Sequence, residues 1–121
     1  RFSCQINETS ALFAGATDVP EMNHNEIVAW TSKSASNRAL LLFSSEDLHP
    51  RTSARMEWML EEIESSPTWV VECEGKSLLE RLLYAAHVTD WVSIGLALLT
   101  GEDPSEMPAI ESLKTHLASI Q

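Results

Sequence analysis

The chain has 121 residues, of which 44% are apolar, so it has enough material for one hydrophobic core and predicts a single domain. Asp and Glu outnumber Lys and Arg by 18 to 8, which gives a formal net charge of -10. A field of this sign repels nucleic-acid phosphates and anionic lipids, so we expect neither nucleic acid nor a membrane as a partner. Two cysteines, Cys4 and Cys73, lie outside any CxxC pair and predict a reduced, cytoplasmic protein.

Residues 1–14 carry an irregular apolar pattern that fits a helix, or the frayed end of one, only loosely. The segment GATDVP that follows, residues 15–20, predicts a loop by its composition. The chain does not open on Met and starts in a pattern typical of the middle of a helix, so we expect it to be a piece of a larger protein. Residues 1–20 lack a basic segment leading into an apolar core, and a signal peptide is therefore not expected.

A short helix is predicted over residues 21–31, in the stretch PEMNHNEIVAW, which places His24 between two asparagines and near Glu21 and Glu26. Imidazole and carboxylate are ligands for divalent metals. However, residues two apart on a helix point to different sides and no second ligand cluster follows, so no metal site is expected. Two roles stay open for His24. It is a hydrogen-bonding or capping residue, which the residues alone favour, or a general acid or base held by a carboxylate.

Two short apolar runs predict buried β-strands, residues 38–45 (RALLLFSS) and residues 68–75 (TWVVECEG). Between them, residues 51–65 place apolar side chains at helical spacing and predict an amphipathic helix. This order is typical of a βαβ unit and implies an α/β fold, with a parallel sheet and helices on both faces. Ligands of such sheets gather beyond the carboxyl ends of the strands, here near residues 44–49 and 73–77.

Two strands are fewer than such a sheet normally has. We therefore expect either that residues 9–17 supply a further strand or that the sheet is incomplete on its N-terminal side, with the remainder upstream of Arg1. Both alternatives keep the α/β class.

The longest predicted helix opens with a capping box, Ser77 and Glu80, and runs to about Thr100, where Gly101 ends it. Apolar residues surround this helix on nearly every side, so we expect it to lie in the core. Its apolar stretch has nearly the length of a membrane span, but its middle carries polar residues, which favours a buried helix of a soluble protein: His87, Thr89, Asp90 and Ser93. A last amphipathic helix is predicted over residues 106–119.

Other single residues allow a plain structural interpretation. His87, in the long helix, is expected to be a hydrogen-bonded core histidine, with a subunit contact as the alternative. His49 follows a strand, where a binding role and a turn role have equal weight. Glu8 taken alone is a surface carboxylate. The tryptophans are expected to pack in the core: Trp30, Trp58, Trp69 and Trp91.

A family resemblance rests on five segments in chain order: QINET, PEMNHNEIVAW, HPRTSARMEWMLEEI, LLYAAHVTDWVSIGLALLTGEDP and AIESLK. They resemble the carboxyl-terminal domain of the bifunctional phosphoglucose/phosphomannose isomerases, within the sugar isomerase (SIS) domain superfamily. The strings NHNEI and DWVS are the most specific. The resemblance implies that residues 1–121 are an SIS-like domain, a flavodoxin-type three-layer sandwich, in a two-domain chain whose first domain carries the phosphate-binding loop.

The resemblance also implies a chemistry. Family members interconvert glucose 6-phosphate, or mannose 6-phosphate, and fructose 6-phosphate through a cis-enediol, without a cofactor, in homodimers whose active sites lie between subunits. The matching motifs assign the catalytic base to Glu8, a ring-opening histidine given by the partner subunit to His24, and a lysine acting at the ring oxygen to Lys114. A carboxylate suits proton abstraction next to a carbonyl, and an imidazole suits proton exchange near neutral pH.

The chain departs from the family pattern at two places. Thr9, Ser10 and Ala11 follow Glu8 where the family motif commonly continues with asparagine, alanine and lysine. Met107 stands where some members that accept mannose 6-phosphate carry a threonine. The sugar preference is therefore open, and a non-catalytic phosphosugar-binding or dimerisation module is the alternative function. The 121 residues alone are expected to bind sugar phosphate poorly and to turn over little or none.

Overall fold

A computed structural model describes residues 1–120 of the chain. The elements, in chain order, are α1 (Phe2–Thr9), η1 (Glu21–Asn23), α2 (Glu26–Trp30), η2 (Lys33–Asn37), β1 (Leu40–Ser44), α3 (Pro50–Glu62), β2 (Thr68–Glu72), α4 (Leu78–Thr100) and α5 (Pro108–Ala118). The chain divides into two compact units, Thr17–Ala85 and Arg1–Ala16 with Ala86–Gln121, and each is described by itself. Helix α4 belongs to both, because the boundary falls between Ala85 and Ala86.

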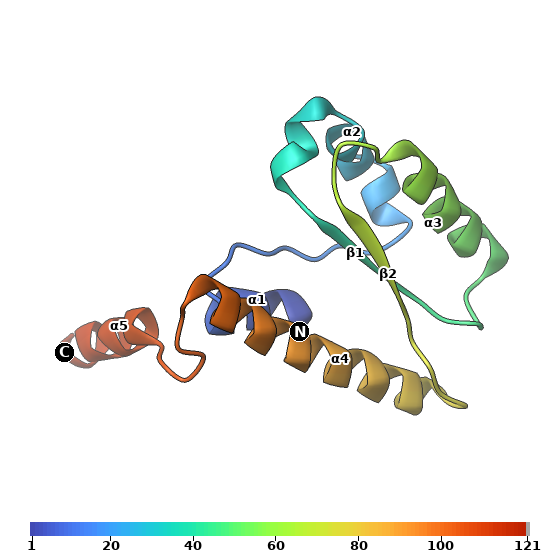
Figure 1. Ribbon diagram of the computed structural model, residues 1–121. Coiled ribbons are helices and arrows are strands. Elements are labelled where there is room, and N and C mark those ends of the chain that lie inside the picture. The colour runs from blue at the N-terminus through green and yellow to red at the C-terminus, as the bar shows by residue number, and fades with distance from the viewer. Residues whose placement is uncertain (121) are drawn as a thin grey trace. The chain divides into compact units, whose positions relative to one another are not determined.

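The sheet of the unit Thr17–Ala85 consists of β1 and β2, which run parallel side by side (Figure 1). Their register pairs Leu40 with Thr68 and Ser44 with Glu72. Helix α3 makes the crossover between them, as parallel neighbours require. The predicted βαβ unit and the α/β class are therefore confirmed. Of the two alternatives for the rest of the sheet, the strand at residues 9–17 is absent, since α1 ends at Thr9 and residues 10–18 form no helix or strand.

The core of this unit lies on one face of the sheet. Leu40 and Leu42 point to the same face of β1 and pack against buried residues of α3 and η1. The buried cluster consists of Met22, Leu40, Leu42, Met56, Met59 and Ile63. The opposite face is covered poorly, because Phe43 and Trp69 keep 39% and 56% of their surface exposed. The prediction that both strands are buried on both faces is wrong for the described residues.

Arg81, near the start of α4, binds both loops that follow the two strands. Arg81 donates to Asp47 at 2.7 Å and to the carbonyl oxygen of Gly75 at 2.7 Å. A hydrogen bond from Ser45, together with the Arg81 guanidinium, holds the pKa of Asp47 below its ordinary value. Gly75 has a φ of +146°, and a Cβ there would lie 2.6 Å from the Cβ of Glu80, so only glycine fits. These contacts fix the carboxyl ends of both strands.

The predicted capping box at the start of α4 is confirmed. Ser77 Oγ accepts from the backbone N–H of Glu80 at 3.3 Å, and the Glu80 carboxylate accepts from the backbone N–H of Ser77 at 3.0 Å. At the other end Gly101 has a φ of +79°, the left-handed conformation that ends many helices.

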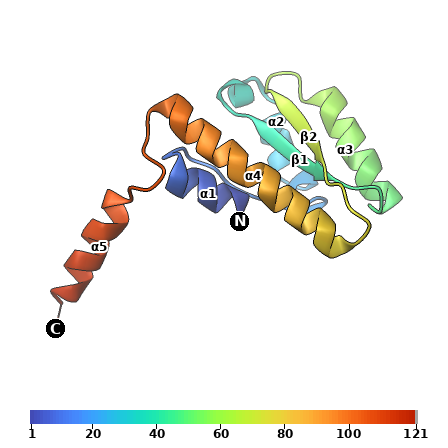
Figure 2. The ribbon, with the colours of Figure 1, turned by 60° about the horizontal axis from the view of Figure 1, so that its bottom comes forward.

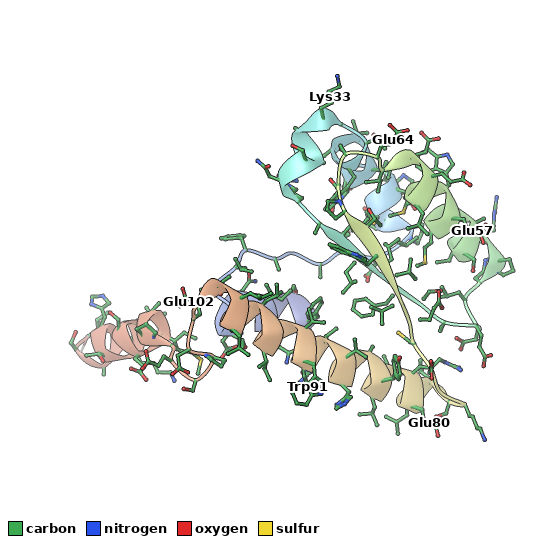
Figure 3. All side chains as sticks on the ribbon, viewed as in Figure 1. Lys33, Glu57, Glu64, Glu80, Trp91 and Glu102 are labelled. Carbon is green, nitrogen blue, oxygen red and sulfur yellow. The ribbon has the colours of Figure 1, made fainter. Side chains whose placement is uncertain are left out.

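Helix α4 exposes much of its apolar surface, which contradicts the prediction of a core helix. Its exposed large apolar residues are Leu78, Leu79, Leu82, Leu83, Trp91, Val92, Ile94, Leu98 and Leu99. Figure 3 shows the Trp91 side chain projecting from the helix. Within the described residues α4 is long and apolar enough to cross a membrane, by length and composition alone. An apolar composition indicates that a helix gains stability from burial, but it does not show that the rest of the described chain buries α4.

The tryptophans and the short helices also differ from expectation. Trp58, Trp69 and Trp91 are exposed by 47%, 56% and 64%, so they are not core residues of the described chain. The helix expected over residues 21–31 is divided into η1 and α2, because the Asn25 side chain accepts from the backbone N–H of Glu26 and starts a new helix.

Candidate active site

Glu8 lies in the last turn of α1, with its side chain exposed and without a hydrogen bond or ion pair in the described part of the chain. The residue before it has a structural role. Asn7 donates to the carbonyl oxygen of Ala14 at 3.0 Å and accepts from the Ala14 backbone N–H at 2.7 Å. These two bonds fold the following loop back on the helix, so the backbone around Glu8 is fixed while its carboxylate stays available.

The end of α1 that carries Glu8 is anchored to α4, and the two helices lie side by side in both views (Figures 1 and 2). Ser10 is fully buried and donates to the carbonyl oxygen of Ser93 at 2.8 Å. Ser93 and Ala97 are exposed by 2% and 0%, and such small side chains allow a close approach between helices. Ser10, one of the departures from the family motif, therefore serves to hold α1 in place.

The other end of α1 is tied to α4 through Asp90. Its carboxylate accepts from Arg1 at 2.7 Å and from the amide of Gln5. The hydrogen bonds from Arg1 and then Gln5 hold the pKa of Asp90 below its ordinary value of 3.8. Both ends of the helix that carries Glu8 are thus bonded to α4.

We expect the Asp90 contacts to make stability depend on pH at the acidic end. A carboxyl group whose pKa is lowered in the folded state stabilises fully above its unfolded value, about 3.9, and loses this contribution as pH falls through the folded pKa. The melting temperature of the wild type should therefore exceed that of Asp90→Asn above about pH 4, and the difference should shrink below it. Asp18→Asn, which removes a carboxylate without such bonds, is the control. A difference that is constant from pH 2 to pH 6 (roughly the range of the linkage) would contradict the assignment.

His24 lies in the other unit, at the end of η1, and its side chain is exposed. Its backbone N–H donates to Glu21 at 2.9 Å, but its imidazole makes no hydrogen bond within the described residues. Neither Glu21 nor Glu26 holds the ring, and the cap of α2 is Asn25. The structure thus gives the imidazole no capping role.

Lys114 lies in the middle of α5, all of whose described side chains are exposed or nearly so. Glu8 and Lys114 belong to one compact unit and His24 to the other. Among the described residues no hydrogen bond or ion pair joins any two of the three.

The remaining histidines take other roles. His49 caps α3, because its Nδ1 accepts from the backbone N–H of Arg51 at 3.2 Å, which is the turn role. His87 is exposed and accepts from the indole N–H of Trp91 at 3.3 Å, so the prediction of a core histidine is wrong. Over residues 1–120 no group of three His, Cys, Asp or Glu side chains is arranged to hold a metal ion.

Sequence reasoning missed a hollow of about 430 Å³ in the unit Thr17–Ala85, lined by Asn23, Ile27, Arg51, Ala54, Arg55 and Trp58. Four of the six lie on one face of α3, at positions one turn apart. The signal was present in the sequence, because Arg51, Arg55 and Trp58 repeat at helical spacing on the side of the predicted helix away from its apolar stripe.

Comparisons with known proteins agree on one family. Residues 1–117 match the family described as "Bacterial phospho-glucose isomerase C-terminal SIS domain". The chain is 39% identical over 122 aligned positions to a bifunctional phosphoglucose/phosphomannose isomerase of Aquifex aeolicus (strain VF5), an alignment that covers 97% of the chain and 38% of the relative. A protein of the same name from Thermoplasma volcanium is 32% identical, with 98% of the chain and 38% of the relative covered. The chain thus spans less than half the length of these relatives. No solved structure matches it significantly.

Proposed function

Because the chain belongs to the family of bacterial phosphoglucose isomerase C-terminal SIS domains, we propose that it is the domain of a sugar-phosphate isomerase that supplies the catalytic base. The reaction is the interconversion of glucose 6-phosphate, or mannose 6-phosphate, and fructose 6-phosphate. The observation that carries this proposal is the name shared by relatives that align with 97% and 98% of the chain.

Glu8 is proposed as the base. Its carboxylate would remove the proton from C2 of the open-chain aldose and return it to C1 of the cis-enediol, while a hydroxyl proton moves between the two oxygens. The chain's contribution is positional, since Asn7 and Ser10 fix the backbone on either side of an available carboxylate. Glu8 is exposed, so the substrate or neighbouring protein would have to exclude water around it.

His24 and Lys114 are proposed for ring opening. His24, from the partner subunit of a homodimer, would exchange a proton with the sugar ring, and Lys114 would stabilise negative charge at the ring oxygen. Both side chains are exposed and unpaired within the described residues, which leaves them available for a ligand. His24 belongs to the unit Thr17–Ala85, and Glu8 and Lys114 belong to the other unit.

The alternative function, a non-catalytic phosphosugar-binding or dimerisation module, is favoured by one observation. Ser10 stands where the family motif near the base commonly has another residue. Its hydrogen bond to the carbonyl oxygen of Ser93 gives it a role in packing α1 on α4. A motif altered for packing would also suit a domain that has lost catalysis. The cytoplasm is proposed for either function, because Cys4 and Cys73 are free thiols and phosphosugars are intracellular metabolites.

An assay of the intact protein separates the two functions. We expect it to convert glucose 6-phosphate to fructose 6-phosphate without added cofactor, and in D₂O to incorporate solvent deuterium at C2 of the recovered aldose, because a carboxylate base exchanges its proton with solvent. Calorimetric binding of glucose 6-phosphate with neither conversion nor deuterium incorporation would overturn the catalytic proposal and favour the binding module.

A further inference from the structure

The hollow beside α3 is lined by two arginines that form no ion pair within the described residues. Arg51 and Arg55 lie one turn apart, and the Arg55 side chain donates to the carbonyl oxygen of Arg51 at 3.2 Å. In contrast, Arg1 and Arg81 both form ion pairs with Asp side chains. The chain carries eight basic and eighteen acidic residues, and its overall field repels anions, so anion binding depends on local positive charge. These two arginines, which form no ion pair within the described residues, supply such a charge.

The wall opposite α3 offers an acceptor rather than a donor. The Oδ1 atom of Asn23 is buried without a hydrogen-bond partner in the described residues, while its Nδ2 donates to the sulfur of Met59 at 3.2 Å. A buried polar atom without a partner is uncommon and costs free energy, and because this oxygen is closed to solvent a ligand hydroxyl reaches it only if the Asn23 side chain turns.

The floor of the hollow is aromatic and apolar. Trp58 lies one turn beyond Arg55 on the same face of α3 and keeps 47% of its surface exposed, and Ile27 and Ala54 complete the apolar lining. An exposed indole binds the C–H face of a sugar ring by burying apolar surface. Fork-shaped guanidinium groups bind phosphate with paired hydrogen bonds.

We propose that the hollow between η1, α2 and α3 binds a phosphorylated sugar, with the phosphate on Arg51 and Arg55, a hydroxyl on Asn23 and the ring against Trp58. The site contains neither Glu8 nor Lys114, although Asn23 directly precedes His24, the histidine proposed for the partner's active site. It goes beyond the proposed isomerase function, because neither the base nor the lysine of that function lines the hollow.

The indole N–H signal of Trp58 in a ¹H–¹⁵N spectrum of the intact protein provides a local measurement. It is assigned among the four tryptophan signals by Trp58→Phe. We expect glucose 6-phosphate to shift this signal, inorganic phosphate to shift it with weaker affinity, and glucose to leave it unchanged. Arg51→Gln with Arg55→Gln should weaken the affinity by at least about tenfold per arginine, since each loses charge-assisted hydrogen bonds.

The matched control is Arg38→Gln with Lys33→Gln, which removes the same two charges outside the hollow. Figure 3 shows Lys33 projecting from η2. The control should bind as the wild type does. The proposal is overturned if glucose 6-phosphate leaves the Trp58 signal unchanged, if inorganic phosphate binds as tightly as the sugar phosphate, or if both double variants lose affinity equally. These outcomes do not depend on turnover, so the isomerase proposal stands or fails separately.

Discussion

Glu8→Gln is expected to lower kcat of the intact protein for glucose 6-phosphate by about 10²–10⁴-fold, the range that a positioned general base contributes. Glutamine keeps the size of the side chain but cannot take a proton from carbon. KM should change little, because the amide can still occupy the place of the carboxylate. Deuterium incorporation at C2 should fall with kcat, since both depend on the same proton removal.

The Glu8→Gln substitution should affect catalysis without affecting folding. The Glu8 side chain is exposed and unbonded within the described residues, so its replacement should leave the melting temperature unchanged. Glu102→Gln is the control, because Glu102 is also an exposed carboxylate, near the end of α4 (Figure 3). Equal turnover by the wild type and Glu8→Gln would remove Glu8 from the mechanism.

The secondary structure was predictable because its signals are local. Ser77 and Glu80 form the capping box that their spacing predicts, and the apolar run that contains Leu40 and Leu42 becomes a strand. The main boundary error, at Asn25, came from a capping side chain that divides one expected helix into two. A hydrophobic pattern has no means of detecting such a break.

Burial was predicted less well, because it depends on what covers a surface. Trp69 and Trp91 carry the pattern of core residues but are more than half exposed in the described chain. An apolar sequence indicates that burial of a side chain lowers the free energy. It does not identify the surface that packs against that side chain. Large exposed apolar surface is typical of an interface.

The candidate site shows the same division. Motif resemblance nominates Glu8, His24 and Lys114 as candidates, but the roles of Ser10 and Asn7 in holding α1 appear only when Ser93 and Ala14 are brought near them. For the hollow, the helical spacing of Arg51 and Trp58 indicates only the α3 side, because Asn23 is distant in sequence and joins it through the packing of η1 on α3.

Mixing two inactive variants tests whether His24 serves the partner's active site. We expect Glu8→Gln and His24→Asn each to have little activity alone. In a mixed dimer, the subunit with His24→Asn keeps Glu8 and receives an intact His24 from the subunit with Glu8→Gln, so one complete active site forms. Random exchange of subunits makes half of the dimers mixed, each with one of two sites intact, and activity should recover to about one quarter of the wild-type value.

The control mixture combines Glu8→Gln with Lys114→Gln. These residues belong to one compact unit, and if one subunit supplies both, a mixed dimer holds no complete active site and no activity returns. Subunit exchange is verified by mass spectrometry of the mixed species. Should mixed dimers of Glu8→Gln and His24→Asn form without recovery, the two groups do not meet across the subunit interface. Since a symmetric dimer presents each residue twice, recovery can arise only if His24 crosses to the other copy.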